Sequence, residues 1–206
     1  GGLSFRQAYL DVASGAHDIV LATGLEKMTD VDGGAATYAL STAADQEYEC
    51  FHGITFPGLY AMMARVHMAQ YGTSEADIAD VAVKNHNHGS MNPLAQFPMK
   101  VTQEQVMNSV AVADPLRILH CSPITDGAAA AILVPLEMAA SLSKTPPVKI
   151  AASAHATDTI ALHDRDDLAW LGSTAKAAEI AYQQAGCGPT DLSFCEVHDC
   201  FTIAEI

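Results

Sequence analysis

The chain carries its most diagnostic pattern in the stretch Asp114-Pro-Leu-Arg-Ile-Leu-His-Cys-Ser-Pro-Ile-Thr-Asp-Gly-Ala-Ala-Ala-Ala-Ile-Leu133. Its second half is a turn followed by an apolar run of small residues, which is typical of a buried strand. The second diagnostic stretch is Glu196-Val-His-Asp-Cys-Phe-Thr-Ile-Ala-Glu-Ile206, where a polar pair stands between a short apolar run and a helical start. Open α/β sheets place reactive groups where a strand gives way to a helix, so these stretches predict an α/β fold with a site at His198.

The rest of the chain repeats one order of elements. Helices are predicted over 3–13 and 173–185, each closed by a glycine, and buried strands follow them over 18–24 and 192–197. These assignments come from apolar residues at helical spacing and from short continuous apolar runs. A helix–strand unit that recurs suggests two related α/β halves.

A long excursion separates the two helix–strand units. It is predicted to hold helices over 57–71 and 75–85, a short helix opened by the capping pair Thr102 and Gln105, and a returning strand over 128–134. Ser74 is the expected N-cap of the second helix, whose buried stripe would be Ile78, Val81 and Ala82. The proline-rich segment 143–147 precedes a predicted strand over 148–152 and is the expected domain boundary.

Composition argues against several classes of function. The formal net charge is −14, whereas a nucleic-acid-binding protein needs a basic surface. No apolar run approaches the roughly 18 residues that cross a membrane, so no membrane partner is expected. The five cysteines lack paired short spacings, which favours reduced thiols in a cytoplasmic protein. His86, His88 and His120 are expected to be solvated loop residues, and no metal site is predicted because no four ligands have zinc spacing.

Together, the two diagnostic stretches resemble the thiolase superfamily, and His198-Asp-Cys-Phe201 resembles the version in sterol-carrier-type and archaeal thiolases. The segment Gly24-Leu-Glu-Lys-Met-Thr29 resembles a common turn of that family. The resemblance implies a partial thiolase-like layered fold, with helices packed on mixed sheets in two related halves. It places residues 1–145 in the N-terminal half, with an inserted loop domain at about 31–109, and residues 146–206 at the start of the C-terminal half.

The resemblance also implies a chemistry. Thiolases form or break a carbon–carbon bond next to a coenzyme A thioester through an acyl-cysteine, with the thioester as substrate and no cofactor besides. The family's nucleophilic cysteine stands three residues before the glycine that Gly1 matches, and its later catalytic histidine and second cysteine follow the region that ends at Ile206. We therefore expect these 206 residues to be inactive alone, with exposed edges and apolar faces on the strands at 19–23 and 129–134. The complete protein is expected to bind acyl-CoA as a homodimer or homotetramer.

Five candidate site residues follow from the family motifs. A lone histidine is nonspecific, but His198 in this context is expected to donate to the thioester oxygen in an oxyanion hole. Ser122 aligns with a family serine that touches the pantetheine arm, although a serine bonded to its own turn is the alternative. Phe201 is expected to form a pocket wall beside His198. Phe56 and Pro57 occupy the place where many thiolases hold a His-Met pair over the substrate.

Two other functions remain open from the sequence. One is a noncatalytic thiolase-like protein that binds acyl-CoA or scaffolds an enzyme complex, and the residue three places before Gly1 separates it from the enzyme. The other is a condensing enzyme similar to a ketoacyl synthase, against which the turn at Gly24–Met28 counts. Cys200 is interpreted as a small packed residue and not as a partner of His198 in a catalytic pair.

Overall fold

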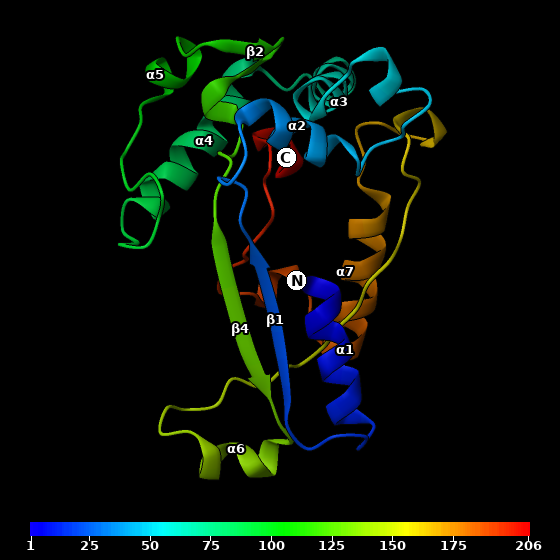
Figure 1. The fold of residues 1–206 in the computed structure, drawn as a ribbon, viewed down its shortest axis with the longest axis vertical. Helices are drawn as coiled ribbons and strands as arrows, with labels where there is room; N and C mark the ends of the chain where they lie inside the picture. The colour runs from blue at the N-terminus through cyan, green and yellow to red at the C-terminus, as the bar shows by residue number, and fades with distance from the viewer. The chain divides into compact units, whose positions relative to one another are not determined.

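The computed structural model describes residues 1–206, and the chain forms two compact units (Figure 1). Unit 1 consists of Gly1–Met28, Asp126–Asp158 and Leu171–Phe194. Unit 2 consists of Thr29–Thr125, Thr159–Trp170 and Cys195–Ile206. Each unit is therefore assembled from segments that lie far apart in the sequence. The expected division after residue 145 remains a prediction.

Unit 1 packs a helix on a two-stranded ladder. Its elements are α1 (Gly2–Ala13), β1 (Val20–Glu26), β4 (Gly127–Leu133), α6 (Leu136–Leu142) and α7 (Gly172–Ala185). The strands β1 and β4 run antiparallel, from Val20 opposite Leu133 to Glu26 opposite Gly127. Helix α1 covers one face of this ladder, where Ala8 packs with Ala22 and Leu133 in a buried cluster. This helix-on-sheet layer agrees with the predicted α/β fold class, and both long helices lie where the sequence predicted them.

The prediction of a fully buried first strand is wrong. In β1 only Ala22 is buried, whereas Leu21 is 61% exposed and Leu25 is 79% exposed. Successive side chains of a strand point to opposite faces, and α1 covers only the face that carries Ala22. Ile132, paired with Leu21 on the uncovered face, is 70% exposed. This open apolar face confirms the expectation that these strands would expose hydrophobic surface.

Two other predicted strands do not form. Residues 148–152 and 192–197 have no regular secondary structure, and Val148 and Phe194 are exposed. An apolar, β-prone run becomes a strand only when a neighbouring strand accepts its backbone hydrogen bonds. Within this chain neither run has such a neighbour.

Unit 2 is mainly helical. Its helices are α2 (Gly33–Ser41), α3 (Phe56–Tyr71), α4 (Glu75–Gly89) and α5 (Gln103–Met107), and its short strands are β2 (Ala111–Ala113) and β3 (Leu116–Arg117). Short 3-10 turns lie at Cys50–His52 (η1), Ile118–His120 (η2), Leu162–Asp164 (η3) and Thr202–Ala204 (η5), whereas η4 (Pro189–Asp191) belongs to unit 1. The strands β2 and β3 pair antiparallel.

Local signals position these helices well. Pro57 lies in the first turn of α3, and Gly72 ends the helix with a positive φ of 75°. The predicted N-caps Ser74 and Thr102 both form capping boxes, at α4 and α5. Helix α4 extends beyond the predicted end to Gly89, and its buried stripe contains Ala79 in place of the expected Val81.

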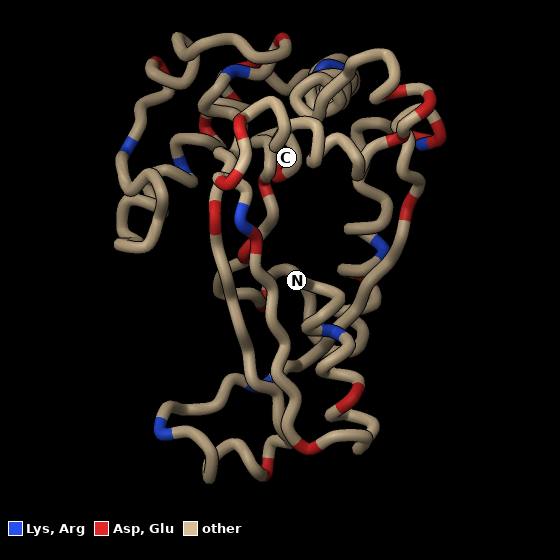
Figure 2. Tube along the Cα trace, in the orientation of Figure 1, with Lys and Arg blue, Asp and Glu red and all other residues tan.

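Charge is spread thinly over both units. Figure 2 shows Lys and Arg as isolated positions along the trace, without a basic cluster. The chain holds only ten Lys and Arg against 24 Asp and Glu. None of the helices has the length and apolar character that a membrane span requires.

Candidate functional site

The two diagnostic stretches meet in unit 2. Cys121 and Phe201 face each other in an isolated antiparallel bridge. Next to it, the backbone N–H of Ser122 donates to the carbonyl oxygen of Cys200 at 3.0 Å. The backbone itself therefore fixes the segment that follows His198 against the segment that carries Ser122.

The bridge rests on an apolar cluster of unit 2. Phe201 and Ile203 are buried there with Ala61, Ala64, Ile78 and Leu116. The ring of Tyr60 stacks on Phe201, with 4.5 Å between ring centroids and an interplanar angle of 26°. Burial, reinforced by a hydrogen bond with Cys200, raises the pKa of Tyr60 far above its ordinary value. Tyr60 thus remains protonated, and Cys200 lies half-buried against this cluster, as its interpretation as a packed residue requires.

The acidic residues of the second stretch are anchored to helix α4. The amide nitrogen of Asn85 donates to Asp199 Oδ2, and also to Glu205 Oε2 at 3.0 Å. Lys84 forms an ion pair with Glu205. Burial opposes ionisation of Glu205, but hydrogen bonds from Lys84 and Asn85, together with the charge of Lys84, outweigh it and lower the Glu205 pKa. Adjacent residues of α4 therefore hold the chain on both sides of the buried turn η5.

The predicted site residues occupy different environments. His198 is exposed, immediately before the anchored Asp199. Ser122 lines a cavity of unit 2. Phe201 is part of the core, and Phe56 packs against the same apolar cluster. Pro57 begins α3. The structure thus brings Phe201 and Phe56 to one cluster, and it joins Ser122 to Cys200 at the edge of that cluster by a backbone hydrogen bond. The roles of all five residues remain predictions.

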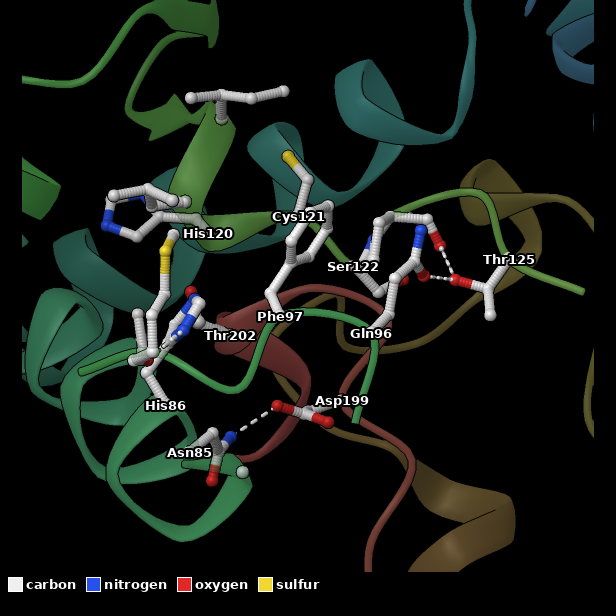
Figure 3. Close-up of a pocket in the computed structure, with 16 residues that line it drawn as sticks. Asn85, His86, Gln96, Phe97, His120, Cys121, Ser122, Thr125, Asp199 and Thr202 are labelled. Carbon is white, nitrogen blue, oxygen red and sulfur yellow. Dashed lines mark hydrogen bonds between the residues drawn. The ribbon is translucent and has the colours of Figure 1, made fainter. Parts of the chain in front are cut away.

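The cavity beside Ser122 has a volume of about 570 Å³ and is shown in Figure 3. Its walls come from α4, from the loop after α4, from the segment 118–125 and from the second diagnostic stretch. Its polar lining residues are Asn85, His86, Gln96, His120, Ser122, Thr125, Asp199 and Thr202. Gln96 and Thr125 are joined by a side-chain hydrogen bond. The sequence indicated Ser122 among them and placed His120 among the solvated loop histidines, but it did not indicate Thr202 or Asn85.

The expectation that His120 is a solvated loop histidine is wrong. Its side chain is only 2% exposed, because the turn η2 packs against α4 and α5. Its Nδ1 accepts a hydrogen bond of 3.1 Å from the backbone N–H of Arg117. Burial, together with the nearby charge of Arg117, lowers the His120 pKa to about 4. At neutral pH the ring is therefore uncharged, with its proton on Nε2.

Two polar atoms in the cavity wall have no partner. His120 Nε2 and Thr202 Oγ1 are both buried, and neither forms a hydrogen bond within the chain. Thr202 is 4% exposed. The described residues bring together no group of three or more His, Cys, Asp or Glu side chains that could hold a metal ion.

The cavity also contains a thiol. Burial raises the pKa of Cys121 to about 11, and its Sγ donates to the carbonyl oxygen of Arg117 at 3.4 Å. Cys121 is therefore a protonated thiol at neutral pH, which makes it a poor nucleophile.

The anchor on α4 gives a test of this geometry. Replacing Asn85 by alanine leaves two half-buried carboxylates without their shared donor, so we expect unit 2 to lose about 1.5–3 kcal/mol of stability. Lys84→Met is the matched control, because its more exposed ion pair is worth about 1 kcal/mol or less. Amide hydrogen exchange at Ser122, whose N–H bonds Cys200, measures both effects. Equal protection in the two variants would contradict the anchoring role of Asn85.

Comparison with known proteins adds to this geometry. The description "Thiolase, N-terminal domain" matches residues 1–137, and "Thiolase C-terminal domain-like" matches residues 154–206. An acetyl-CoA acetyltransferase of Methanothermobacter thermautotrophicus is 57% identical over 206 residues, which are 100% of this chain and 53% of that protein. An acetyl-CoA acetyltransferase of Methanocaldococcus jannaschii is 51% identical, over 98% of this chain and 52% of its own length.

A solved structure has a similar fold. The solved structure of an Ltp2-ChsH2(DUF35) aldolase superposes with a TM-score of 0.80 at 26% identity, over 98% of this chain and 54% of that chain. The chain thus spans about half the length of the relatives it matches. Both ends of the described sequence fall inside the matched regions, and the junction of the two diagnostic stretches lies within them. The chain belongs to the thiolase family.

Proposed function

We propose that the protein is a thiolase-type acyltransferase that acts on acyl-CoA thioesters. The observation that carries this proposal is the junction of the His-Asp-Cys-Phe segment with the Cys121-Ser122 segment, through the bridge and the Ser122–Cys200 hydrogen bond. The names of the archaeal relatives, acetyl-CoA acetyltransferase, support the same reaction class.

In the cleavage direction, a cysteine thiolate attacks the keto carbon of a 3-ketoacyl-CoA, and negative charge develops on the carbonyl oxygen. The bond between the keto carbon and the adjacent carbon then breaks. The enolate of acetyl-CoA leaves and is protonated, and the acyl group passes from the cysteine sulfur to the sulfur of a second coenzyme A. Condensation is the reverse. The nucleophile is assigned by family resemblance to the position three residues before Gly1.

Each candidate residue has a role in this scheme. His198, exposed immediately before the anchored Asp199, donates to the thioester oxygen as the negative charge of that oxygen grows. Ser122 contacts the pantetheine arm. Phe201 lies beneath the site and is held in place by its stacking on Tyr60. Phe56 and Pro57, at the start of α3, border the acyl group.

We also propose that the complete protein is a cytoplasmic homodimer or homotetramer. All five cysteines are free thiols in the structure, which suits a reducing compartment. The open apolar face of β1 and β4, with Leu21, Leu25 and Ile132 exposed, is surface that must be covered in a stable assembly.

The test is a thiolysis assay of the natural gene product with acetoacetyl-CoA and coenzyme A. Acetyl-CoA formation that disappears when the cysteine three residues before Gly1 is changed to serine supports the proposal. Binding of acyl-CoA without turnover, with another residue at that position, would identify a noncatalytic acyl-CoA-binding protein and refute the enzyme assignment.

A further inference from the structure

A short segment of unit 2, residues 159–170, is fixed against the segment that precedes α3 (Figure 1). Leu162 is buried, and its backbone N–H donates to Oε1 of the buried Glu49 at 2.7 Å. The ring of His163 meets the ring of Tyr48 edge-on, with 5.3 Å between ring centroids. The turn η3 is therefore held in one place, although 113 residues separate Leu162 from Glu49 in the sequence.

Arg165 follows this turn and carries an unpaired charge. Its side chain is half-buried and forms no hydrogen bond or ion pair within the chain. Its Nε is buried, whereas its two terminal nitrogens are not, so a ligand can reach them. The carboxylates next to it in the sequence are directed elsewhere: Asp164 Oδ1 faces His163 Nε2 at 3.6 Å, and Asp167 Oδ1 accepts from the backbone N–H of Ala169.

The guanidinium of Arg165 lies beside Tyr60 of α3. Burial raises the pKa of Tyr60, and the charge of Arg165 acts against that rise, as a cation near a phenol does. Tyr60 in turn stacks on Phe201 and forms a hydrogen bond with Cys200. Phe56 stands one helical turn before Tyr60 and packs against the same apolar cluster. Arg165 therefore flanks the start of α3, which the proposed function assigns to the acyl group.

The lone charge narrows the chemistry of a ligand at this place. A half-buried cation has lost part of its hydration, and proteins normally compensate it with an anion. The chain holds 24 Asp and Glu against ten Lys and Arg, so a partner within the chain was easily available and was not used. A guanidinium offers N–H donors in a planar fork, which matches a carboxylate through two parallel hydrogen bonds. A carboxylate is therefore the ligand group that fits Arg165.

We propose that Arg165 is a specificity-determining residue, which binds a carboxylate at the far end of the acyl group and directs the protein to 3-ketoacyl-CoA esters that carry one. This inference rests on the proposed thiolase activity, since it names the substrate class of the same site. With 3-oxoadipyl-CoA, the bond between the keto carbon and the adjacent carbon breaks, coenzyme A takes the succinyl group, and acetyl-CoA is the other product. The far carboxylate is unchanged in this step and contributes through binding alone.

The experiment compares thiolysis of two esters by the natural gene product. One is 3-oxoadipyl-CoA, and the other is 3-oxohexanoyl-CoA, which has the same number of carbon atoms but ends in a methyl group. We expect kcat/KM to be at least about tenfold higher for 3-oxoadipyl-CoA, as for a hydrogen bond to a charged group. Both rates scale with the amount of folded protein, so partial unfolding does not change their ratio. Equal values, or a preference for 3-oxohexanoyl-CoA, would overturn the inference.

Variants locate the preference. Arg165→Met keeps an apolar stem and removes the guanidinium, so kcat/KM for 3-oxoadipyl-CoA should fall about ten- to a hundredfold, whereas the value for 3-oxohexanoyl-CoA should stay within a few-fold. Arg165→Lys keeps the charge without the fork and should recover part of the preference. Arg65→Met is the matched control, because Arg65 is an exposed arginine of α3 that pairs with Asp114. It should leave the ratio unchanged.

Two other anions are distinguished by the same variant. If Arg165 binds a carboxylate elsewhere in the assembled protein, Arg165→Met changes stability or oligomeric state with an unaltered ratio. If it binds a phosphate of coenzyme A, the KM for coenzyme A rises equally with both esters. Either result would overturn the inference.

A binding measurement keeps this inference separate from the proposed function. If neither ester is cleaved, the proposed activity fails, and calorimetric titration with succinyl-CoA and butyryl-CoA decides the role of Arg165. Tighter binding of succinyl-CoA that is lost in Arg165→Met supports the inference in a noncatalytic protein, and equal affinities contradict it. Cleavage of both esters with equal kcat/KM removes the inference and leaves the thiolase activity standing.

Discussion

Replacing His198 by alanine in the natural gene product is expected to lower thiolytic turnover by about 100- to 1000-fold, the usual effect of losing one oxyanion-hole donor. The interaction strengthens as negative charge develops on the thioester oxygen, so it acts mainly in the transition state. We therefore expect a large fall in kcat with little change in KM. Steady-state kinetics with acetoacetyl-CoA and coenzyme A measure both quantities.

Two further variants separate this role from a structural one. His198→Asn should recover part of the lost turnover, because other family members place asparagine at this position and its amide can still donate. Cys200→Ala is the matched control in the same motif, since Cys200 is half-buried against the apolar cluster. It should stay within a few-fold of the parent. Full turnover in His198→Ala would contradict the role assigned to His198, and loss of turnover in a folded Cys200→Ala protein would contradict the interpretation of Cys200 as a packed residue.

His198 is exposed, as a side chain that donates to a bound thioester must be. Its neighbour Asp199 is fixed to α4 by Asn85, and Phe201 is fixed by the bridge to Cys121 and the stack on Tyr60. The backbone on the C-terminal side of His198 is therefore held by three contacts, whereas its own ring remains open to a ligand. Fixed backbone with an accessible donor is the arrangement that preorganised catalysis requires.

Sequence patterns predicted the elements whose causes are local. The start and end of α3 follow from Pro57 and Gly72, and the capping boxes at Ser74 and Thr102 depend on residues three positions apart. Each of these features is determined within a few residues, so periodicity and capping rules suffice. The strand β4 and the helices α1 and α7 were found for the same reason.

Features that depend on distant partners were predicted poorly. The stretches 148–152 and 192–197 have the composition of strands, but a strand also needs a neighbour to complete its hydrogen bonds. The apolar run at β1 suggested burial on both faces, yet only α1 covers it in this chain. The apolar composition of a segment indicates that the segment can be buried, but it does not indicate which other element covers it.

The residues of the candidate site show the same difference between local and long-range causes. Ser122 and His198 were indicated by motifs that the family shares, and the structure tests neither role. His120 was misjudged because its burial depends on how η2 packs against α4 and α5. Thr202 follows a recognised motif residue, but its unpaired hydroxyl becomes visible only when every possible partner has been placed in space.

We expect the 206-residue chain by itself to catalyse no acyl transfer from acetoacetyl-CoA. A typical enzyme, by comparison, turns over about 10 times per second. An acyl-cysteine mechanism needs a thiolate, which proteins stabilise at the N-terminus of a helix or beside a cation. None of the five cysteines lies in the first turn of an α-helix. Cys121, with a pKa of about 11, is ionised in only about one molecule in a thousand at pH 8.

The measurement combines turnover with the intact mass of the chain after incubation with acetoacetyl-CoA, and the natural gene product serves as the positive control. We expect the mass of the 206-residue chain to remain unchanged, whereas alkylation by iodoacetamide should modify the exposed Cys195 faster than Cys121. Faster alkylation of Cys195 than of Cys121 would show that both thiols are present and that burial slows the reaction of Cys121. A stoichiometric acyl adduct on any of the five cysteines, together with turnover, would place the nucleophile inside this chain and overturn its assignment to the position before Gly1.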